Sequence, residues 1–375
     1  MTKKSSNTVT TKKTKKINEK AIDNKCPGCG APIHFNPSLN KWKCEYCNSE
    51  FSLEEMQKHN NASSVQNNEN IEENTKQIND STKYISYKCK NCGAEIIADE
   101  QTAATFCVYC GNTAILKSKL SGKFAPDYII PFKTEKKLAE KAFQDLSKGR
   151  PFMPKDFNNV TNIEKIRGIY IPFWLYSLDV AGSLNFNGQR VKSWTSGDRH
   201  YTRIDYYKIY RTGSMKFERI PIDGATRFDN AIMNSIEPFN YEKLEKYNHA
   251  YLSGFYAEKY DVENDVAVGF AVNRAIESAK QAMLDDAPMY SGKIVFENTL
   301  RSETSKKEYV LLPVWMVNVK YKDKTYIFAM NGQTGEFIGD IPIDKTKVIL
   351  SSIGLFIALF IVLLFLSYII YILGV

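Results

Sequence analysis

The sequence predicts an α+β protein with two small four-cysteine modules, a β-rich mixed domain with a few helices, and one C-terminal membrane helix. Three observations support this prediction. All eight cysteines lie in four C-x-x-C pairs, residues 125–343 are dense in Tyr, Phe and β-branched residues, and residues 348–373 contain no charge. With 375 residues, 43% hydrophobic and 25% charged, the chain can form two or three domains and is not disordered as a whole.

Residues 1–24 are predicted to be a basic disordered arm. The first 25 residues hold eight lysines against one glutamate and one aspartate, so +6 of the formal net charge of +8 lies there. The rest of the chain is nearly neutral, which argues against a uniformly basic protein that coats nucleic acid. The arm has no apolar core of the kind a secretory signal requires. Its candidate contacts with nucleic acid or lipid are Lys12, Lys13, Lys15 and Lys16.

The cysteines form two equivalent sets. Each set has the spacing C-x2-C-x14-C-x2-C, and the second begins 63 residues after the first, which indicates an internal duplication. Two pairs of thiolates on tight turns can close a tetrahedral site around one zinc ion, and this spacing is typical of a zinc ribbon. The predicted ligands are Cys26, Cys29, Cys44 and Cys47 in ribbon 1 (residues 25–51) and Cys89, Cys92, Cys107 and Cys110 in ribbon 2 (residues 84–114).

Both zinc ions are expected to be structural, because four thiolates leave no position for water or substrate. His34 and His59 are therefore not needed as ligands. A ribbon of about 25 residues buries too little apolar surface to fold alone, so both ribbons should unfold without metal. Disulfide bonds are disfavoured in the cytoplasm, and a redox centre would not come as two equally spaced sets.

A disordered linker is predicted over residues 52–83. This segment is rich in Asn, Gln, Glu and Ser and has almost no large apolar residue. Ribbon 1 should therefore move freely as a tethered module, whereas ribbon 2 joins the main domain directly.

Residues 115–343 are predicted to form one α+β domain with two clear helices. Thr134 is expected to cap the first helix and Asn264 the second. The expected core-facing residues are Leu138, Ala139, Ala142, Phe143 and Leu146 in the first helix, and Val268, Val272, Ile276, Ala279 and Met283 in the second.

The same domain contains an internal repeat. Pro172-Phe-Trp174 followed by Asn187-Gly-Gln parallels Pro313-Val-Trp315 followed by Asn331-Gly-Gln. Each copy predicts a long strand, a return and an Asn-Gly turn. The prolines should lie at strand starts or edges, and the tryptophans should be core anchors.

Residues 348–373 are predicted to be a transmembrane helix. The 26 uncharged residues exceed the roughly 18 to 20 needed to span a bilayer. A buried core helix of that length would need a protein interior about 39 Å long. Lys345 and Lys347 precede the span, so the positive-inside rule places the bulk of the chain in the cytoplasm as a tail-anchored, single-pass protein of the cell membrane.

No catalytic residue is predicted, and the chain is not expected to be an enzyme. It contains no G-x4-G-K-[ST], H-E-x-x-H, G-x-S-x-G or G-x-G-x-x-G motif. His200 is the one histidine among polar groups of the main domain, and it is expected to be a turn or strand residue. The alternative is an enzyme in residues 125–343, which would need an apolar pocket with convergent carboxylates or His200.

Residues 199–219 combine six Arg or Lys with two acids and four tyrosines. Ordinary strands with charged edges are the favoured interpretation. A surface that stacks and neutralises nucleic acid, or one that meets an anionic membrane, would have the same composition. The candidate contacts are Arg199, Arg203, Lys208 and Arg211.

Taken together, these motifs resemble the bacterial TFIIB-type zinc-ribbon membrane proteins. The resemblance covers almost the whole chain beyond residue 24. Besides the ribbons, it is carried by Leu120-Ser-Gly, Pro126-Asp-Tyr-Ile-Ile-Pro-Phe132, Gly168-Ile-Tyr-Ile-Pro-Phe-Trp174, Ser235-Ile-Glu-Pro238 and Gly254-Phe-Tyr-Ala-Glu-Lys-Tyr-Asp-Val262. Members are often labelled as primosomal helicases or phage replication proteins, but this chain lacks a helicase motor. Many members carry one ribbon, whereas this chain has two.

The resemblance implies a membrane platform in the envelope-stress response, because one Bacillus relative belongs to an operon with a phage-shock-type and a flotillin-like protein. Proteins of those two kinds are the implied partners. The expected function is a non-enzymatic adaptor that recruits proteins to the membrane and holds two structural zinc ions. The alternative is a membrane-tethered protein that binds DNA or RNA.

Overall fold

The computed structural model describes residues 21–22, 24–65, 84–89, 95–99, 101–106, 113–116, 120, 122–154, 157, 166–322 and 324–373. The chain divides into two compact units. Unit 1 contains Met1–Asn36, Asn40–Pro126 and Asn248–Asp261, and unit 2 contains Pro37–Leu39, Asp127–Tyr247 and Val262–Val375. The predicted boundary near residue 115 therefore differs from the observed division, because residues 248–261 belong to the same unit as the ribbons.

Unit 1 is built from short strands. Ribbon 1 is a three-stranded antiparallel sheet of β2 (His34–Asn36), β3 (Lys41–Lys43) and β4 (Glu50–Phe51). In the second cysteine region β5 (Tyr84–Lys88) pairs with β6 (Glu95–Asp99). The order β1-β8-β7-β13 joins β1 (Ala21–Ile22), β8 (Thr113–Leu116), β7 (Thr102–Phe106) and β13 (Tyr256–Glu258). The 3-10 turns η2 (Gly122–Phe124) and η5 (His249–Leu252) complete the unit.

The predicted disordered linker is wrong over residues 53–65, which form helix α1 (Leu53–Val65). Ser52 and Glu55 cap this helix reciprocally: Glu55 N donates to Ser52 Oγ (3.3 Å), and Ser52 N donates to Glu55 Oε2 (2.7 Å). This is a capping box, and its Ser-x-x-Glu signature is visible in the sequence. Met56 is fully buried under the helix. The rest of the predicted linker, residues 66–83, lies outside the described residues.

Ribbon 1 packs against η5 and is not a freely moving module. Trp42 Nε1 donates to the Ala250 carbonyl at 2.9 Å, and Phe35 N donates to the Ser253 carbonyl at 3.0 Å. The rings of Phe35, Trp42 and Tyr251 contact one another at centroid distances of 4.9 to 5.4 Å. The partners lie more than 200 residues away in the chain, so composition alone could not reveal this contact.

Unit 2 is organised around two long antiparallel neighbours, β10 (Arg167–Ser196) and β15 (Arg301–Tyr321). β11 (Arg199–Asp223) flanks β10 on the other side, and β16 (Lys324–Asn331) and then β17 (Phe337–Gly339) follow β15. β14 (Ser291–Asn298) extends the line of β15 along β10. β9 (Tyr128–Ile129) pairs with β15 in parallel and with β12 (Glu245–Lys246).

Helices and aromatic side chains cover this sheet. The helical segments are α2 (Lys136–Gln144), η3 (Asp145–Ser147), α4 (Asn230–Ser235), η4 (Tyr241–Lys243), α5 (Asn264–Asp285) and α6 (Lys345–Leu373). An apolar core joins the strands to the region of α4, with Phe173, Leu312, Met233 and Ile236 among its buried members. Phe143 and Phe157 both pack on Phe328 of β16.

The internal repeat appears as two hairpins, β10/β11 and β15/β16, joined through the β10–β15 pair. Trp174 and Trp315 are 7% and 6% exposed, which confirms them as core anchors, and their indoles donate to Val262 O (2.9 Å) and Thr134 Oγ1 (3.0 Å). Pro172 and Pro313 lie inside long strands, contrary to the prediction. Each stands where one neighbouring ladder ends, so its missing N–H breaks no strand pairing.

The second Asn-Gly turn is confirmed and the first is wrong. Asn331 ends β16, and its side-chain oxygen accepts from the N–H groups of Gln333 and Thr334. Asn187 instead lies in the middle of β10, opposite Lys208. A Cβ at Gly188 would come within 2.9 Å of Tyr290, so this glycine makes room for a side chain and not for a turn.

The two predicted helices form, with corrections. Thr134 does not cap α2; its hydroxyl donates to the Gly332 carbonyl at 2.9 Å. Ala139, Phe143 and Leu146 are buried as predicted, whereas Leu138 is 46% exposed. In α5 Ala279 and Met283 are buried as predicted, but the rest of the buried stripe lies one residue before the predicted Val268, Val272 and Ile276. It consists of Ala267, Ala271 and Ala275. Small side chains at every fourth position let the helix lie close to the strands.

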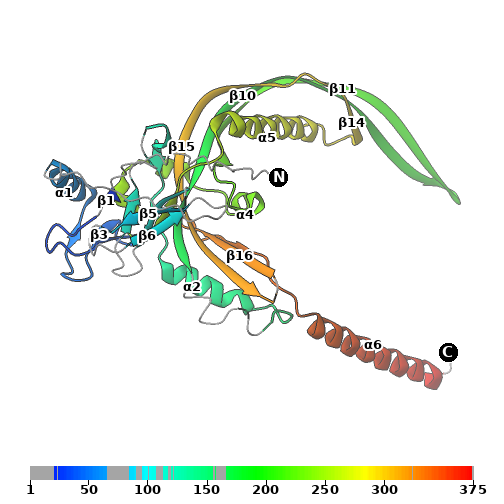
Figure 1. Cartoon of the computed structure of the whole chain (residues 1–375). Helices are drawn as coiled ribbons and strands as arrows, with labels where there is room; N and C mark the ends of the chain where they lie inside the picture. The colour runs from blue at the N-terminus through cyan, green and yellow to red at the C-terminus, as the bar shows by residue number, and fades with distance from the viewer. Residues whose placement is uncertain are drawn as a thin grey trace, which may run out of the picture. The chain divides into compact units, whose positions relative to one another are not determined.

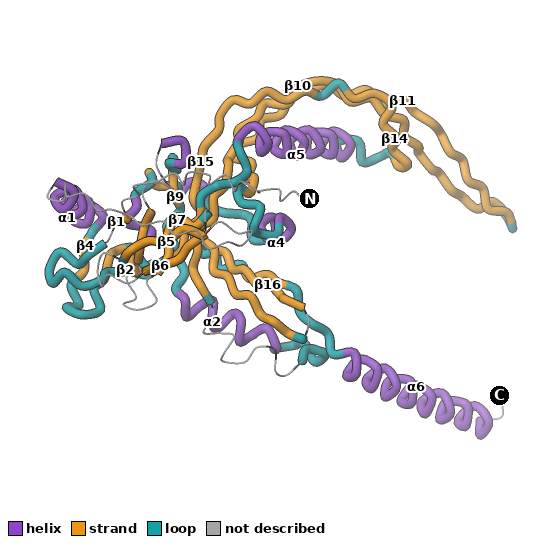
Figure 2. Tube along the Cα trace, in the orientation of Figure 1, coloured by secondary structure: helices purple, strands orange, loops and turns teal. Residues whose placement is uncertain are grey.

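The β10/β11 hairpin projects beyond the rest of the sheet of unit 2 (Figures 1 and 2). α5 runs along the inner side of the hairpin and stops before its end. The pairing is irregular around Ser177, which meets an extra residue on both neighbouring strands, β11 and β15. Arg219 stands in the left-handed region there, with φ 54°. Such bulges bend a strand and increase its twist.

Candidate functional sites

Four thiols of ribbon 1 converge at one point, as predicted. The Sγ atoms of Cys26, Cys29, Cys44 and Cys47 all lie within 4.8 Å of one another. The Cys26–Cys47 and Cys29–Cys44 sulfur distances are both 3.6 Å. A disulfide requires about 2.05 Å, so these contacts are not covalent. The cluster has the donors and the size to hold one metal ion.

The two turns that carry these thiols follow from local sequence. In each turn the residue after the second cysteine has positive φ, 72° at Gly30 and 57° at Asn48. Glycine and asparagine are the residues that adopt this conformation most readily. The turns are closed by bonds from Gly30 N to Cys26 O (2.9 Å) and from Cys44 N to Ser49 O (3.0 Å). Cys26 and Cys44 point inward and are buried, while Cys29 and Cys47 are exposed.

The thiols influence one another's ionisation. Hydrogen bonds with the Ser49 side chain and backbone lower the pKa of Cys47 to about 6. At Cys29 a backbone hydrogen bond from Ala31 lowers the pKa, but the contact with Cys47, burial and the other two thiols outweigh it and raise the pKa to about 12. Burial raises the pKa of Cys26. Ionisation of Cys47 therefore opposes ionisation of Cys29, and a bound cation would offset that repulsion.

The second cysteine set is described only at Cys89, which is buried directly after β5. Cys92, Cys107 and Cys110 lie outside the described residues, as do Lys12, Lys13, Lys15 and Lys16 of the arm. Among the described residues, the ribbon 1 cluster is the one group of cysteine, histidine or acidic side chains placed to hold a metal. The duplication of the metal site therefore stays a prediction.

The C-terminal helix α6 is long and apolar enough to cross a membrane over Lys345–Ile369. No residue of its most apolar stretch is buried against the rest of the described chain. Leu355, Phe356 and Leu363 are more than 60% exposed. A core helix of a soluble domain would bury these side chains. At its start, Lys347 Nζ donates to the Met153 carbonyl at 2.7 Å.

The predicted basic contacts of β11 do not share one face. Residues that pair across antiparallel strands lie on the same face of the sheet, and successive residues of one strand point to opposite faces. The pairs Ser196–Arg199, Lys192–Arg203 and Leu184–Arg211 are an even number of residues apart along each strand, so they lie on the same face. Arg199, Arg203 and Arg211 therefore share a face, and Lys208 lies on the opposite one. Arg211 Nε is 3.0 Å from Asp286 Oδ2 at the end of α5.

His200 is an exposed strand residue of β11, and its Nδ1 lies 2.7 Å from Thr195 Oγ1. A groove of about 620 Å³ lies beside the start of α6. Asp340 is the one carboxylate among its lining residues, which include Lys324, Tyr326 and Lys345. This groove therefore brings no two carboxylates together, and His200 is not among its lining residues.

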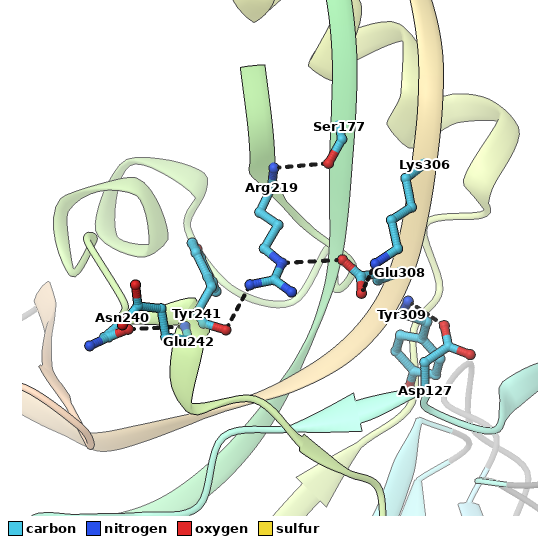
Figure 3. Close-up of polar contacts among 9 residues, drawn as sticks. All are labelled: Asp127, Ser177, Arg219, Asn240, Tyr241, Glu242, Lys306, Glu308 and Tyr309. Carbon is cyan, nitrogen blue, oxygen red and sulfur yellow. Dashed lines mark hydrogen bonds and ion pairs between the residues drawn. The ribbon is translucent and has the colours of Figure 1, made fainter. Parts of the chain in front are cut away.

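An ionic cluster around the buried carboxylate of Glu308 was not expected from the sequence (Figure 3). Glu308 of β15 has a side chain only 4% exposed and sits between two cations: Arg219 Nε is 3.4 Å from Oε2, and Lys306 Nζ is 2.7 Å from Oε1. Arg219 also donates to the Tyr241 carbonyl at 2.8 Å, and its backbone N–H donates to Ser177 Oγ at 3.3 Å. The cluster holds the bulge around Ser177 and Arg219.

A second carboxylate, that of Asp127, holds the backbone of the neighbouring residue Tyr309. Asp127 Oδ2 accepts from the Tyr309 backbone N–H at 2.8 Å, and the Asp127 N–H donates to the Tyr309 carbonyl at 2.8 Å. The lone acids and bases on these strands gave no signal in the sequence, because only the β10–β11–β15 register brings them together.

Comparison with known proteins gives one informative relative. No protein-family model matches the chain, and no solved structure matches it. The chain is 33% identical over 327 residues to the uncharacterized protein YdjG of Bacillus subtilis (strain 168), covering 87% of this chain and 92% of the relative. Identity at that level over nearly the full length of both proteins shows common descent and a common fold. The chain therefore belongs to the same family as the uncharacterized protein YdjG.

Proposed function

We propose that this chain is a membrane-anchored adaptor whose zinc-stabilised ribbons recruit partner proteins to the membrane surface. The convergence of four thiols in ribbon 1 carries the proposal, because a closed four-sulfur site builds a rigid surface and leaves no position for chemistry. α6 supplies the anchor, and its two flanking lysines favour the bulk of the chain on the cytoplasmic side.

Zinc is the metal that fits this donor set best. Tetrahedral zinc with Zn–S bonds of about 2.3 Å places its sulfur atoms about 3.8 Å apart. Two of the sulfur–sulfur distances are 3.6 Å and all lie within 4.8 Å, so shifts of about 1 Å or less would reach that geometry. Soft thiolates also favour zinc over Mg²⁺ and Ca²⁺, which take oxygen ligands. With the second cysteine set, we propose two structural zinc ions in each chain.

The surroundings of the metal site support a binding role for ribbon 1. Tyr46, in the second turn, is 75% exposed. Large exposed side chains on a rigid turn are the kind of anchor that protein interfaces use. The partner classes implied by the resemblance are phage-shock-type and flotillin-like membrane proteins.

The test is quantitative affinity purification of the full chain from solubilised membranes. One variant is Cys29→Ser/Cys47→Ser, which removes the two exposed ligands. The other replaces residues 348–373 by an unrelated apolar span of equal length. We expect specific partners to be lost from the cysteine variant and retained with the replaced span, and zinc content to fall from two ions to one. Equal recovery from the cysteine variant and the wild type would refute the adaptor proposal.

Nucleic-acid binding by a membrane-tethered chain is the second candidate, favoured by the shared basic face of Arg199 and Arg203. It predicts that the full chain in lipid nanodiscs binds DNA or RNA with an affinity that falls steeply as the salt concentration rises. Each neutralised phosphate adds about 0.7 to 0.9 to the slope of log affinity against log salt. No binding at low salt would exclude it.

A further inference from the structure

Among the described residues, none covers either face at the end of the β10/β11 hairpin. β14 begins at Ser291, opposite Gln189, so in the described part of the chain the sheet has two strands beyond that level. α5 ends at Asp285, and Tyr290 covers Gly188 and Tyr207 just before β14 begins. Residues 190–205, here called the tip, extend past all of these elements (Figure 2). The Gly197-Asp198 turn closes the tip, with φ 59° at Gly197.

The two faces of the tip differ in chemistry. The first face carries the register pairs Arg190–Asp205, Lys192–Arg203, Trp194–Tyr201 and Ser196–Arg199. The second carries Val191–Ile204, Ser193–Thr202 and Thr195–His200. All four Arg and Lys residues of the tip therefore lie on one face, called the basic face. A strand needs no such segregation to protect its edges, since cations on either face would do so.

A stacked pair of aromatic side chains lies between the cations of the basic face. Trp194 and Tyr201 stack with ring centroids 5.6 Å apart and 13° between their planes. They are 49% and 40% exposed. Arg190 lies over the Tyr290 ring at 4.9 Å, at the border with the covered part of the hairpin. Arg203 is 68% exposed although it pairs with Asp205.

We propose that the basic face of the tip binds the anionic lipid headgroups of the membrane that α6 enters. Tryptophan and tyrosine side chains prefer the boundary between headgroups and acyl chains, and arginine and lysine reach from there to lipid phosphates. A two-stranded hairpin cannot bury these aromatic rings by itself. α6 keeps the tip near a bilayer, so a weak contact is occupied through effective concentration.

This inference rests on the membrane anchoring of the proposed function and goes beyond it. The adaptor needs only α6 to reach a membrane. A second contact through the tip would fix how the chain lies on the surface and would make that orientation depend on the anionic lipid content. Each cation close to an anionic leaflet raises the ratio of bound to free tip about fivefold, so neutralising three lowers it about 100-fold.

Trp194 is a native probe for the test. The other tryptophans, Trp42, Trp174 and Trp315, are 1%, 7% and 6% exposed, so quenchers reach them poorly. The full chain is placed in nanodiscs of phosphatidylcholine, alone or mixed with phosphatidylglycerol. Each disc contains the same share of phosphatidylcholine brominated on its acyl chains. A Trp194→Phe variant gives the background signal of the buried tryptophans.

We expect bromolipid quenching of Trp194 in the phosphatidylglycerol discs, and little in phosphatidylcholine discs or at high salt. Lys192→Gln/Arg199→Gln/Arg203→Gln should abolish the quenching. The matched variant Lys208→Gln/Lys216→Gln/Lys243→Gln removes the same charge away from the basic face and should keep it.

Equal quenching in both disc types, or equal loss in both triple variants, would overturn the proposal. Shielding of Trp194 from aqueous acrylamide by single-stranded DNA, without quenching in phosphatidylglycerol discs, would overturn it in favour of nucleic acid. A chain that does not co-elute with the discs refutes both the anchor and this contact. Co-elution without quenching refutes the contact alone.

Discussion

The two compact units hold their chains together in different ways. In unit 1 no described strand exceeds five residues, and ribbon 1 joins its strands through a four-thiol cluster and the Phe35–Trp42–Tyr251 contacts. In unit 2 the strands β10 and β15 run for 30 and 21 residues over a continuous apolar core. From this difference we predict that metal removal would affect unit 1, whereas unit 2 depends on packing and on the ionic cluster around Glu308.

Metal removal should produce the largest difference in stability between the two units. Structural zinc contributes about 10 to 16 kcal/mol to a ribbon, more than the whole stability of an ordinary domain. Chelation, or Cys44→Ser at the fully buried ligand, should remove hydrogen-exchange protection from residues 25–51. β10 and α5 should keep theirs. Exchange measured by mass spectrometry checks this, and equal loss in both units would break the comparison.

Arg219→Met/Lys306→Met should destabilise unit 2 by about 3 to 5 kcal/mol, because it leaves the buried carboxylate of Glu308 without a cation. Arg219→Met alone should cost less, since Lys306 still faces the carboxylate. Urea unfolding followed by exchange in β15 measures both. If the double variant is no worse than the single one, the cluster does not hold the bulge.

Ala271→Leu should destabilise unit 2 by about 1 to 3 kcal/mol, because the added side chain has no room in the buried stripe of α5. The matched Ala282→Leu, at an exposed position on the same helix, should be nearly neutral. Thermal unfolding of the two variants gives the comparison. Equal effects would mean that α5 does not lie close to the strands.

The smallest effect should be a pH dependence of unit 1 that does not come from its thiols. Burial holds the pKa of His34 below its usual range, with Glu45 opposing. The folded state therefore favours the neutral ring, and this stability is present above the unfolded pKa of about 6.5 and is lost as the pH falls through the folded pKa.

His34→Gln should remove that part of the acid sensitivity of unit 1. Its metal ligands are unchanged, so the difference from the wild type isolates the imidazole. Exchange protection of β2 and β3 as a function of pH is the measurement. If the difference in exchange protection between His34→Gln and the wild type is the same at neutral and acidic pH, the acid sensitivity does not come from His34.

Local signals in the sequence were sufficient for several features. The C-x-x-C spacing identified the four thiols that converge in ribbon 1, because the tight turns that carry them are formed by a few neighbouring residues. The Ser52-x-x-Glu55 box was equally local but was outweighed by the polar composition of the segment, which is why α1 was missed. The Gly197-Asp198 turn of the tip also depends on local sequence, but it was not predicted.

The sequence by itself determined the four-cysteine centre, the apolar span of α6 and the burial of Trp174 and Trp315. These depend on residue type and short spacing. Tertiary structure alone decided that η5 packs on ribbon 1, that Glu308 meets Arg219, and that the cations of the tip share one face with Trp194. Each of these depends on strand register or on contacts between distant segments, and a shift of one residue in register would reverse every face.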